Sequence, residues 1–329
     1  MSRSILASAP GKAVLSGEYA VLDGAPAVVM GVNRRAVVRV EPGEEDHHVV
    51  EAPGFSSTIG RFTIARSGLR WLEGGDDYAL FEAVLNAGGS RLTDPCRFTL
   101  DTEAFRDRDS GDKLGLGSSA ALSAALAFAL SECDEQDSHP MVAAAGGHRE
   151  FQGGSGSGVD VAAALAGGLI EYRMGESGWL LLDWPEDLHA CFYYSGVSAD
   201  TRERIARLDS STKDPTRLDL VEASTRLVER WRTSHAESIL AELRRYVETL
   251  ERFSDAHALD IFGAGHDRMA ESARELELVY KPSGAGGGDI GVVFGSDRMS
   301  VEVFSSVAES LSFRPLDIEL DPLGARVSQ

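Results

Sequence analysis

Residues 113–130, KLGLGSSAALSAALAFAL, constrain the fold more than any other stretch of the sequence. Gly115 and Gly117 lack a Cβ, so the backbone there can adopt positive φ and turn its N–H groups toward an anion. Ser118 and Ser119 follow at the start of a predicted helix, where unpaired N–H groups and the helix dipole favour negative charge. Alanines and leucines along this helix allow close packing. The stretch therefore predicts a buried helix whose N-terminus binds phosphate.

A glycine loop that merely precedes a core helix is the simplest alternative, and two further glycine-rich stretches argue against it. Residues 9–22 read APGKAVLSGEYAVL, and residues 281–291 read KPSGAGGGDIG. Lys12, Lys113 and Lys281 are three of only four lysines, and each lies in or beside one of these glycine-rich stretches. Arginine supplies the remaining positive charge. This placement predicts an ammonium group for phosphate at each of the three turns.

The composition excludes several classes of function. A net charge of −20 would repel nucleic acid and anionic membrane surfaces. No apolar run is long enough for a membrane span, and the first residues lack the apolar core of a secretory signal, so we expect a cytoplasmic protein. Three separated cysteines and eight scattered histidines predict neither a disulfide framework nor a zinc site. A metal ion should arrive with a nucleotide.

Hydrophobic periodicity predicts an α+β fold without βαβ alternation. The N-terminal strands are expected at 5–9, 13–15, 27–32 and 35–40, separated by turns that include Pro10-Gly11, and later strands at 97–100, 168–172, 179–182 and 190–194. Helices are expected at 77–86, 139–151 and 161–166. Beyond residue 198 the pattern predicts helices at 219–231, 236–253, 256–278 and 299–311, with strands at 290–294 and 317–320. We expect two domains, 1–185 and 186–329.

The three glycine-rich stretches, in this order, resemble the three signatures of the galactokinase, homoserine kinase, mevalonate kinase and phosphomevalonate kinase (GHMP) superfamily. The match in order and spacing extends over most of the chain. The resemblance implies a two-domain GHMP kinase fold, with an N-terminal domain like domain 2 of ribosomal protein S5 and a ferredoxin-like C-terminal domain. It also implies that ATP lies against the middle stretch.

Details within the superfamily are similar to phosphomevalonate kinases. The stretch HREFQGGSGSGVDVA at 148–162, the GEY at 17–19 and the GAGGGD at 284–289 carry this likeness. They imply ATP-dependent phosphorylation of (R)-5-phosphomevalonate to 5-diphosphomevalonate in the mevalonate route to isoprenoids. The glutamate that binds magnesium in mevalonate kinases would fall at Arg149, which leaves the second ligand of Mg²⁺ undetermined.

The resemblance implies a site that contains ATP, Mg²⁺ and a small phosphorylated acceptor. Lys12 and Asp160 are the catalytic candidates, and Ser119 is the candidate Mg²⁺ ligand. The nucleotide-binding candidates are Lys113, Gly115, Leu116, Gly117, Ser118, Ser119 and Ala120. The acceptor-binding candidates are Glu18, Tyr19, His148, Arg149, Gln152, Ser157, Ser198, Ser283, Gly284, Ala285 and Gly286, with Arg202 as a further cation.

The roles of Lys12 and Asp160 depend on the acceptor. An alcohol needs a base, so with mevalonate Asp160 would accept the proton and Lys12 would lower the pKa of the alcohol. A phosphate monoester, with a second pKa of about 6, is already largely ionised at neutral pH. With phosphomevalonate, Asp160 would therefore orient groups and Lys12 would screen the repulsion between two anions.

Other readings of the sequence remain open at this point. Mevalonate kinase, another GHMP small-molecule kinase, and the decarboxylase of this superfamily share the expected fold and an aspartate. A non-enzymatic nucleotide-binding relative is a further alternative, which the presence of both Lys12 and Asp160 disfavours. The oligomeric state is left open, with a homodimer as one alternative.

Overall fold

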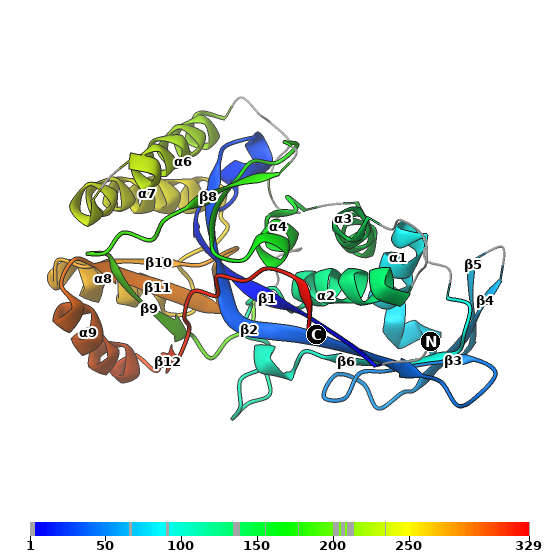
Figure 1. Cartoon of the computed structure of the whole chain (residues 1–329). Coiled ribbons are helices and arrows are strands. Elements are labelled where there is room, and N and C mark those ends of the chain that lie inside the picture. The colour runs from blue at the N-terminus through cyan, green and yellow to red at the C-terminus, as the bar shows by residue number, and fades with distance from the viewer. Residues whose placement is uncertain are drawn as a thin grey trace.

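The computed structural model describes residues 4–65, 68–89, 92–133, 139–154, 156–176, 178–199, 204, 208, 214–233 and 235–328. Two β-sheets with helices packed against them account for these residues (Figure 1). The predicted α+β class is confirmed. No helix in this described part of the chain combines the length and the apolar character that crossing a membrane requires.

The first sheet is organised around two long strands, β1 (Ile5–Ser16) and β2 (Ala27–Pro42), which pair antiparallel along most of their length. The strand order is β13-β1-β2-β6-β3-β4-β5, and β7 pairs with the first part of β2 and with β8. Only the β3–β6 pair is parallel among the pairs described. The remaining strands are β3 (His48–Glu51), β4 (Gly60–Ala65), β5 (Gly68–Glu73), β6 (Cys96–Asp101), β7 (Leu169–Tyr172), β8 (Trp179–Leu182) and β13 (Arg326–Ser328).

Pro10-Gly11 is not a turn, and this part of the sequence prediction is wrong. The register between β1 and β2 shifts between Pro10 and Gly11, so the two residues form an irregularity inside one continuous strand. Such a bulge accepts a proline because it interrupts the regular ladder of hydrogen bonds. Likewise, the predicted strands 27–32 and 35–40 are one strand. Lys12 therefore lies inside the continuous strand β1, directly after this irregularity.

Helices α1 (Ala79–Gly88), α2 (Ser118–Cys133), α3 (Pro140–Phe151) and α4 (Val159–Ala166) pack together beside the first sheet (Figure 1). Helix α2 contacts β1 and β2 directly, and its alanines are buried, which confirms the predicted buried helix. A Cβ on Gly147 would lie 2.5 Å from the Cα of Val84, so this glycine allows α3 to approach α1 closely. Three short 3-10 helices complete this half: η1 (Ala20–Asp23), η2 (Gly75–Tyr78) and η3 (Glu103–Phe105).

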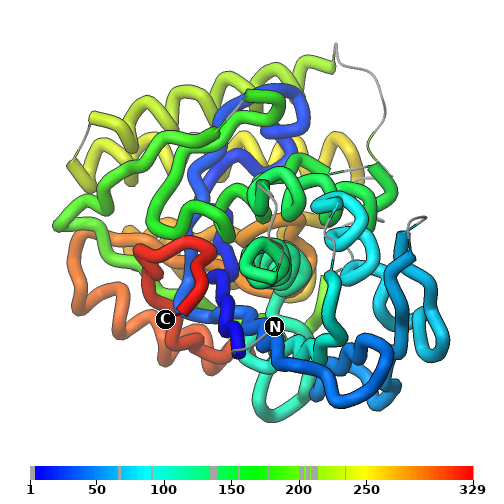
Figure 2. The backbone as a smooth tube through the Cα atoms, turned by 45° about the vertical axis from the view of Figure 1, so that its right-hand side comes forward, coloured from blue at the N-terminus to red at the C-terminus, as the bar shows by residue number. Residues whose placement is uncertain are grey.

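The second sheet is antiparallel, in the order β10-β11-β9-β12. Its strands are β9 (His189–Tyr194), β10 (Val279–Pro282), β11 (Ile290–Gly295) and β12 (Arg314–Leu316), and the helices of this half are α6 (Pro215–Thr233), α7 (Ala236–Ala256), α8 (His266–Glu275) and α9 (Arg298–Ser310). Strand β13 then returns to the first sheet beside β1 (Figure 2). The sheets therefore change between β8 and β9, near the expected domain division, but the last strand crosses back.

Two predictions in this half are wrong. Residues 256–278 do not form one helix, because Ala258, Asp260 and Ala264 adopt positive φ and only α8 is helical. Residues 317–320 are not a strand; Leu320 makes a single bridge to Val32. Strand β10 was not predicted, since it is only four residues long and ends at a proline.

His266, at the start of α8, contacts the backbone of the third glycine-rich stretch. Its Nε2 lies 3.0 Å from the carbonyl oxygen of Gly288, and its Nδ1 lies 2.7 Å from the hydroxyl of Tyr280. A carbonyl only accepts, so Nε2 carries the proton and Nδ1 accepts from Tyr280. The side chain is fully buried, and this burial lowers the pKa of His266 to about 4.

The free energy of unfolding should therefore fall in mildly acidic solution. Unfolded histidine titrates near 6.5, so the stability held by neutral His266 is complete above that pH and is lost progressively down to about pH 4, by roughly 3 kcal/mol. His266→Gln replaces the imidazole N–H donor with an amide N–H donor, and the new side chain does not titrate. Urea denaturation at pH 7, 5.5 and 4.5 should give a shallower pH dependence for this variant than for the wild type. Parallel curves would contradict the assignment of the neutral histidine.

Candidate active site

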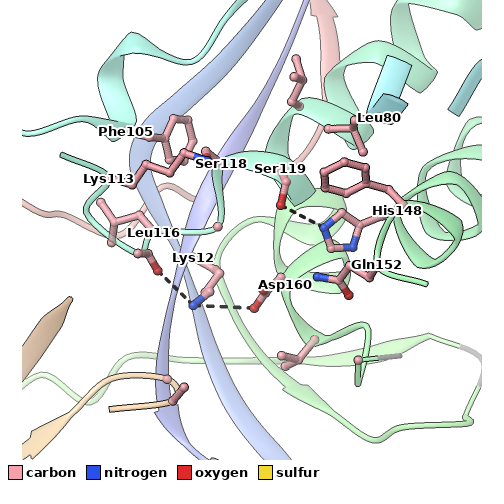
Figure 3. Close-up of a pocket in the computed structure, with 18 of the residues that line it drawn as sticks. Lys12, Leu80, Phe105, Lys113, Leu116, Ser118, Ser119, His148, Gln152 and Asp160 are labelled. Carbon is pink, nitrogen blue, oxygen red and sulfur yellow. Dashed lines mark hydrogen bonds and ion pairs between the residues drawn. The ribbon is translucent and has the colours of Figure 1, made fainter. Parts of the chain in front are cut away.

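A cavity of about 1130 Å³ is lined by residues from both halves of the molecule. The end of β1 and the turn after it form one wall, and the turn before α2 forms another. The segment between α3 and α4, together with Ser283, Gly284, Ala285 and Asp289, completes the lining. The three glycine-rich stretches, which are far apart in the sequence, thus meet around one space. Figure 3 shows residues of the first two, among them Lys12 and Leu116.

The turn before α2 is fixed to β1. Gly115 and Gly117 have φ of 73° and 77°, a region that favours glycine. The backbone N–H of Lys12 donates to the carbonyl oxygen of Leu116 at 2.8 Å. A Cβ on Gly11 would lie 2.6 Å from that same oxygen and from the ring of Phe105, so the absence of a side chain permits the contact. The turn presents the N-terminus of α2 to the cavity.

The Lys12 ammonium and the Asp160 carboxylate lie next to each other in the lining of the cavity (Figure 3). The Nζ of Lys12 lies 3.7 Å from Oδ1 of Asp160 and donates to the carbonyl oxygen of Gly115 at 3.2 Å. Asp160 lies in the first turn of α4, after Gly158, whose φ of 79° begins the helix. The ammonium group is therefore held between the glycine turn and the carboxylate, where an anion would experience both a positive charge and the α2 dipole.

His148 and Ser119 form a second polar contact in the cavity. His148 lies in the last turn of α3, and its Nε2 lies 3.1 Å from Oγ of Ser119 (Figure 3). Gln152 and Ser157 also line the cavity. Mg²⁺ prefers oxygen ligands and usually keeps few of them from the protein. The hydroxyl of Ser119 and the carboxylate of Asp160 are oxygen donors on the same cavity, so the residues present fit such an ion.

The part of the cavity lining that contains Ser283 and Ala285 is held by bonds between the two halves. The Oγ of Ser283 accepts from the N–H of Val14 at 3.0 Å and donates to its carbonyl at 2.9 Å. The hydroxyl of Tyr19 donates to the carbonyl oxygen of Ala285 at 2.7 Å. Ser198 and Gly284 line the same region. Glu18 lines it too, but it is buried and both its carboxylate oxygens bond to protein groups.

Several candidate residues lie elsewhere. Ala120 is buried inside α2, Arg149 is exposed on α3 outside the cavity, and Gly286 does not line it. Arg202 lies outside the described residues. The prediction of a phosphate-binding ammonium at each turn is wrong for Lys281, which is fully buried in β10 and ion-paired with Glu18.

Sequence reasoning missed two features of the site. Asp289, directly after the third run of glycines, lines the cavity; its Oδ1 accepts from the N–H of Ala199, and burial raises the pKa of its carboxyl group. Its place in the motif was a usable signal. Apolar side chains also line the cavity, and because they come from separate elements no local pattern marks them: Phe55, Leu80, Phe81, Phe105 and Leu122.

Known proteins share this sequence pattern and this fold. Residues 83–168 match the family described as the GHMP kinases N terminal domain. Phosphomevalonate kinase of Streptomyces sp. (strain CL190) is 29% identical, with 88% of this chain and 89% of that protein covered. Mevalonate kinase of Pyrococcus abyssi is 26% identical, with 88% of each covered.

Solved structures extend the likeness over nearly the whole chain. The Lin0012 protein of Listeria innocua superposes with a TM-score of 0.86 at 20% identity, covering 99% of this chain and 100% of that one. Streptococcus pneumoniae phosphomevalonate kinase in complex with phosphomevalonate and AMPPNP superposes with a TM-score of 0.77 at 19% identity, covering 96% and 99%. The two-sheet architecture is therefore the GHMP kinase fold.

Gly11→Ala should weaken nucleotide binding. The added Cβ would force the carbonyl of Leu116 away from β1 and displace the turn before α2, at a cost of about 1–3 kcal/mol in the free energy of unfolding. We expect the Kd for ATP, measured by titration calorimetry, to rise at least tenfold. Gly146→Ala in α3 is the control, since its Cβ would meet only Ala87 at 3.3 Å. An unchanged Kd in Gly11→Ala would show that the turn does not depend on this contact.

Proposed function

We propose that this chain, which belongs to the GHMP kinase superfamily of ATP-dependent phosphotransferases, phosphorylates (R)-5-phosphomevalonate to 5-diphosphomevalonate. The observation that carries the proposal is the convergence of the three glycine-rich stretches on one cavity, with the Lys12 ammonium and the Asp160 carboxylate facing each other there. We place the reaction in the cytoplasm, within the mevalonate route to isoprenoids. The oligomeric state, with a homodimer as one alternative, is not part of the proposal.

The choice of acceptor is supported by sequence. The stretch HREFQGGSGSGVDVA at 148–162 and the GAGGGD at 284–289 are similar to phosphomevalonate kinases. The Streptomyces relative carries that name, and the Streptococcus pneumoniae structure holds phosphomevalonate together with AMPPNP. We propose that the acceptor lies against Ser283, Gly284 and Ala285, which line the cavity near Lys12.

Each part of the cavity has a role in this proposal. Bound ATP with Mg²⁺ supplies the γ-phosphoryl group and neutralises part of its charge. The N–H groups of residues 115–118 bind the phosphates, and Ser119 is the residue that would hold the metal ion. The apolar end around Phe55 and Phe105 would bind the base of the nucleotide. Catalysis then depends on positioning and on charge, because phosphoryl transfer needs little covalent chemistry from the protein.

Lys12 and Asp160 act on the acceptor in this mechanism. The Lys12 ammonium lies between the glycine turn and Asp160, so it would screen the repulsion between the acceptor phosphate and the γ-phosphate. The acceptor oxygen is already ionised near neutral pH, so no base is needed and Asp160 would orient Lys12 and the ion.

One observation favours mevalonate kinase as a second candidate. Among the described residues that line the cavity, the basic side chains are Lys12, Lys113 and His148, and Lys113 lies over the ring of Phe55 at 5.8 Å from its centroid. A doubly anionic acceptor would therefore meet few cations. With an alcohol acceptor, the carboxylate of Asp160 would be the general base and Lys12 would lower the pKa of the hydroxyl.

A coupled assay of ADP release with Mg-ATP decides between the candidates. The acceptors are mevalonate, phosphomevalonate, diphosphomevalonate, homoserine and galactose. We expect kcat/KM for phosphomevalonate to exceed that for each other acceptor at least tenfold. A preference for mevalonate would establish the second candidate, and release of CO₂ with diphosphomevalonate would indicate a decarboxylase. ADP formation with none of the five would overturn the proposal.

Substitution of Lys12 and of Asp160 should separate the roles of these two residues. Lys12→Ala should lower kcat by about 10²–10³-fold, the loss typical of a single charge-stabilising group, with little change in the Kd for ATP.

Asp160→Asn should lower kcat severely with mevalonate as acceptor but less with phosphomevalonate, since only the alcohol needs a base. Asp255→Asn, exposed on α7, is the control. Equal losses with both acceptors would contradict the division of roles, and a selective loss of ATP binding would move Lys12 to the nucleotide.

A further inference from the structure

The two halves of the molecule are joined behind the cavity by a fully buried ion pair. The side chains of Lys281 and Glu18 are 0% and 1% exposed, and the Nζ of Lys281 contacts Oε1 of Glu18. Nζ also donates to the carbonyl of Pro282 at 2.6 Å. The second oxygen of Glu18 accepts from the hydroxyl of Tyr246 at 2.7 Å. We call these three residues the Lys281–Glu18–Tyr246 cluster.

The cluster joins three elements that are remote in the sequence. Glu18 follows the end of β1 in the first sheet, Lys281 belongs to β10 in the second, and Tyr246 belongs to α7. The hydroxyl of Tyr246 also accepts from the N–H of Gly17 at 3.0 Å. Each charged group has a partner, which offsets part of the cost of removing the charges from water.

The residues next to the cluster form the acceptor wall of the cavity. Tyr19 follows Glu18 and donates to the carbonyl of Ala285. Ser283 lies two residues after Lys281 and bonds to both backbone groups of Val14. A shift between Glu18 and Lys281 would therefore move both sides of this wall at once.

A buried ion pair is weak evidence for stability, because an apolar pair of the same volume often stabilises a protein as well or better. What a buried pair can fix is relative position, since each charge must find its partner. The candidate role of Glu18 in contacting substrate also conflicts with its bonds, which occupy both of its oxygens.

We infer that Lys281 and Glu18 are positioning residues that set the acceptor wall of the cavity by locking the turn 17–19 to the loop 283–285. Neither side chain touches the acceptor; each acts through Tyr19, Ser283 and Ala285. The identity of the acceptor in the kinetic test rests on the proposed function, whereas the arrangement of the wall does not.

The first test measures hydrogen–deuterium exchange in the whole protein without acceptor. Lys281→Met combined with Glu18→Gln removes both charges and keeps similar volumes. The matched control is Arg232→Met combined with Glu171→Gln, a pair that joins α6 to β7, contains an equally buried carboxylate and lies outside the cavity. We expect exchange in peptides covering 14–20 and 283–288 to rise at least tenfold in the first variant only. Unchanged exchange in these peptides, or an equal rise in the control, would overturn the inference.

The second test measures KM for phosphomevalonate and for ATP separately. The charge-free variant should raise KM for phosphomevalonate at least tenfold while KM for ATP changes less than threefold, and the control should change neither by more than twofold. Lys281→Met alone should raise KM for phosphomevalonate more than the double variant does. The single change leaves the buried Glu18 carboxylate without its partner charge, whereas the double variant replaces that carboxylate with a neutral amide. Equal rises in both KM values would indicate a general loss of structure and would contradict a positioning role.

The two tests separate the inference from the proposed function. A wild-type protein that does not phosphorylate phosphomevalonate refutes the proposed function, while the exchange experiment still decides the inference. If the charge-free variant does not fold, Tyr246→Phe replaces it, since this change removes only the hydroxyl that Glu18 and Gly17 share. The same two peptides should then exchange faster, by at least threefold, and no change in them would overturn the inference.

Discussion

The close approach of two backbones, at β1 and at the turn before α2, is the contact on which the rest of the site depends. The N–H of Lys12 bonds to the carbonyl of Leu116, and only a residue without a side chain at position 11 leaves room for it. The same contact places the Lys12 ammonium beside the start of α2. The small side chains of α2 allow this helix to pack closely against β1, and the bulge in β1 lies directly before Lys12. The geometry around Lys12 is therefore set by the packing of the core.

The opposite side of the same turn is closed by Asp289. A Cβ on Gly115 would lie 2.4 Å from the carboxyl group of Asp289, so the third glycine-rich stretch fits directly against the second. Asp289 also bonds to the N–H of Ala199, and its own N–H donates to the carbonyl of Val197 at 2.6 Å. One residue thus contacts the turn before α2, belongs to the third glycine-rich stretch and bonds to the segment that contains Ser198. Burial at this contact raises the pKa of the Asp289 carboxyl group.

The sequence allowed the fold class and the buried helix α2 to be predicted, because hydrophobic periodicity and small-residue helices are local signals. The meeting of the glycine-rich stretches was implied by the resemblance to the GHMP superfamily, since no local pattern shows which segments meet in space. Lys281 could not be assigned correctly in the same way. Lys12 and Lys281 both lie beside glycine turns, yet one faces the cavity and the other pairs with Glu18 inside the protein. Their partners distinguish them: Lys281 pairs with Glu18, which is 263 residues away in the sequence, and no local pattern shows such a contact. The same reason applies to the bulge at Pro10, to the turn at 258–264 and to the apolar end of the cavity.

The return of β13 to the first sheet links the two halves in a way that their separate sheets do not suggest. Residues 319–328 cross over β2 and β1, where Asp321 bonds to the backbone of Gly31 and Arg35 bonds to Asp321 and Gly324. The sheet that carries Lys12 consequently includes a strand that the ribosome makes after the whole second sheet. Contacts of such long sequence separation slow folding, because much of the chain must be ordered before they form. The strand that contains Lys12 therefore gains this neighbour only after the second sheet has been synthesised, and an incomplete nascent chain lacks this part of the sheet.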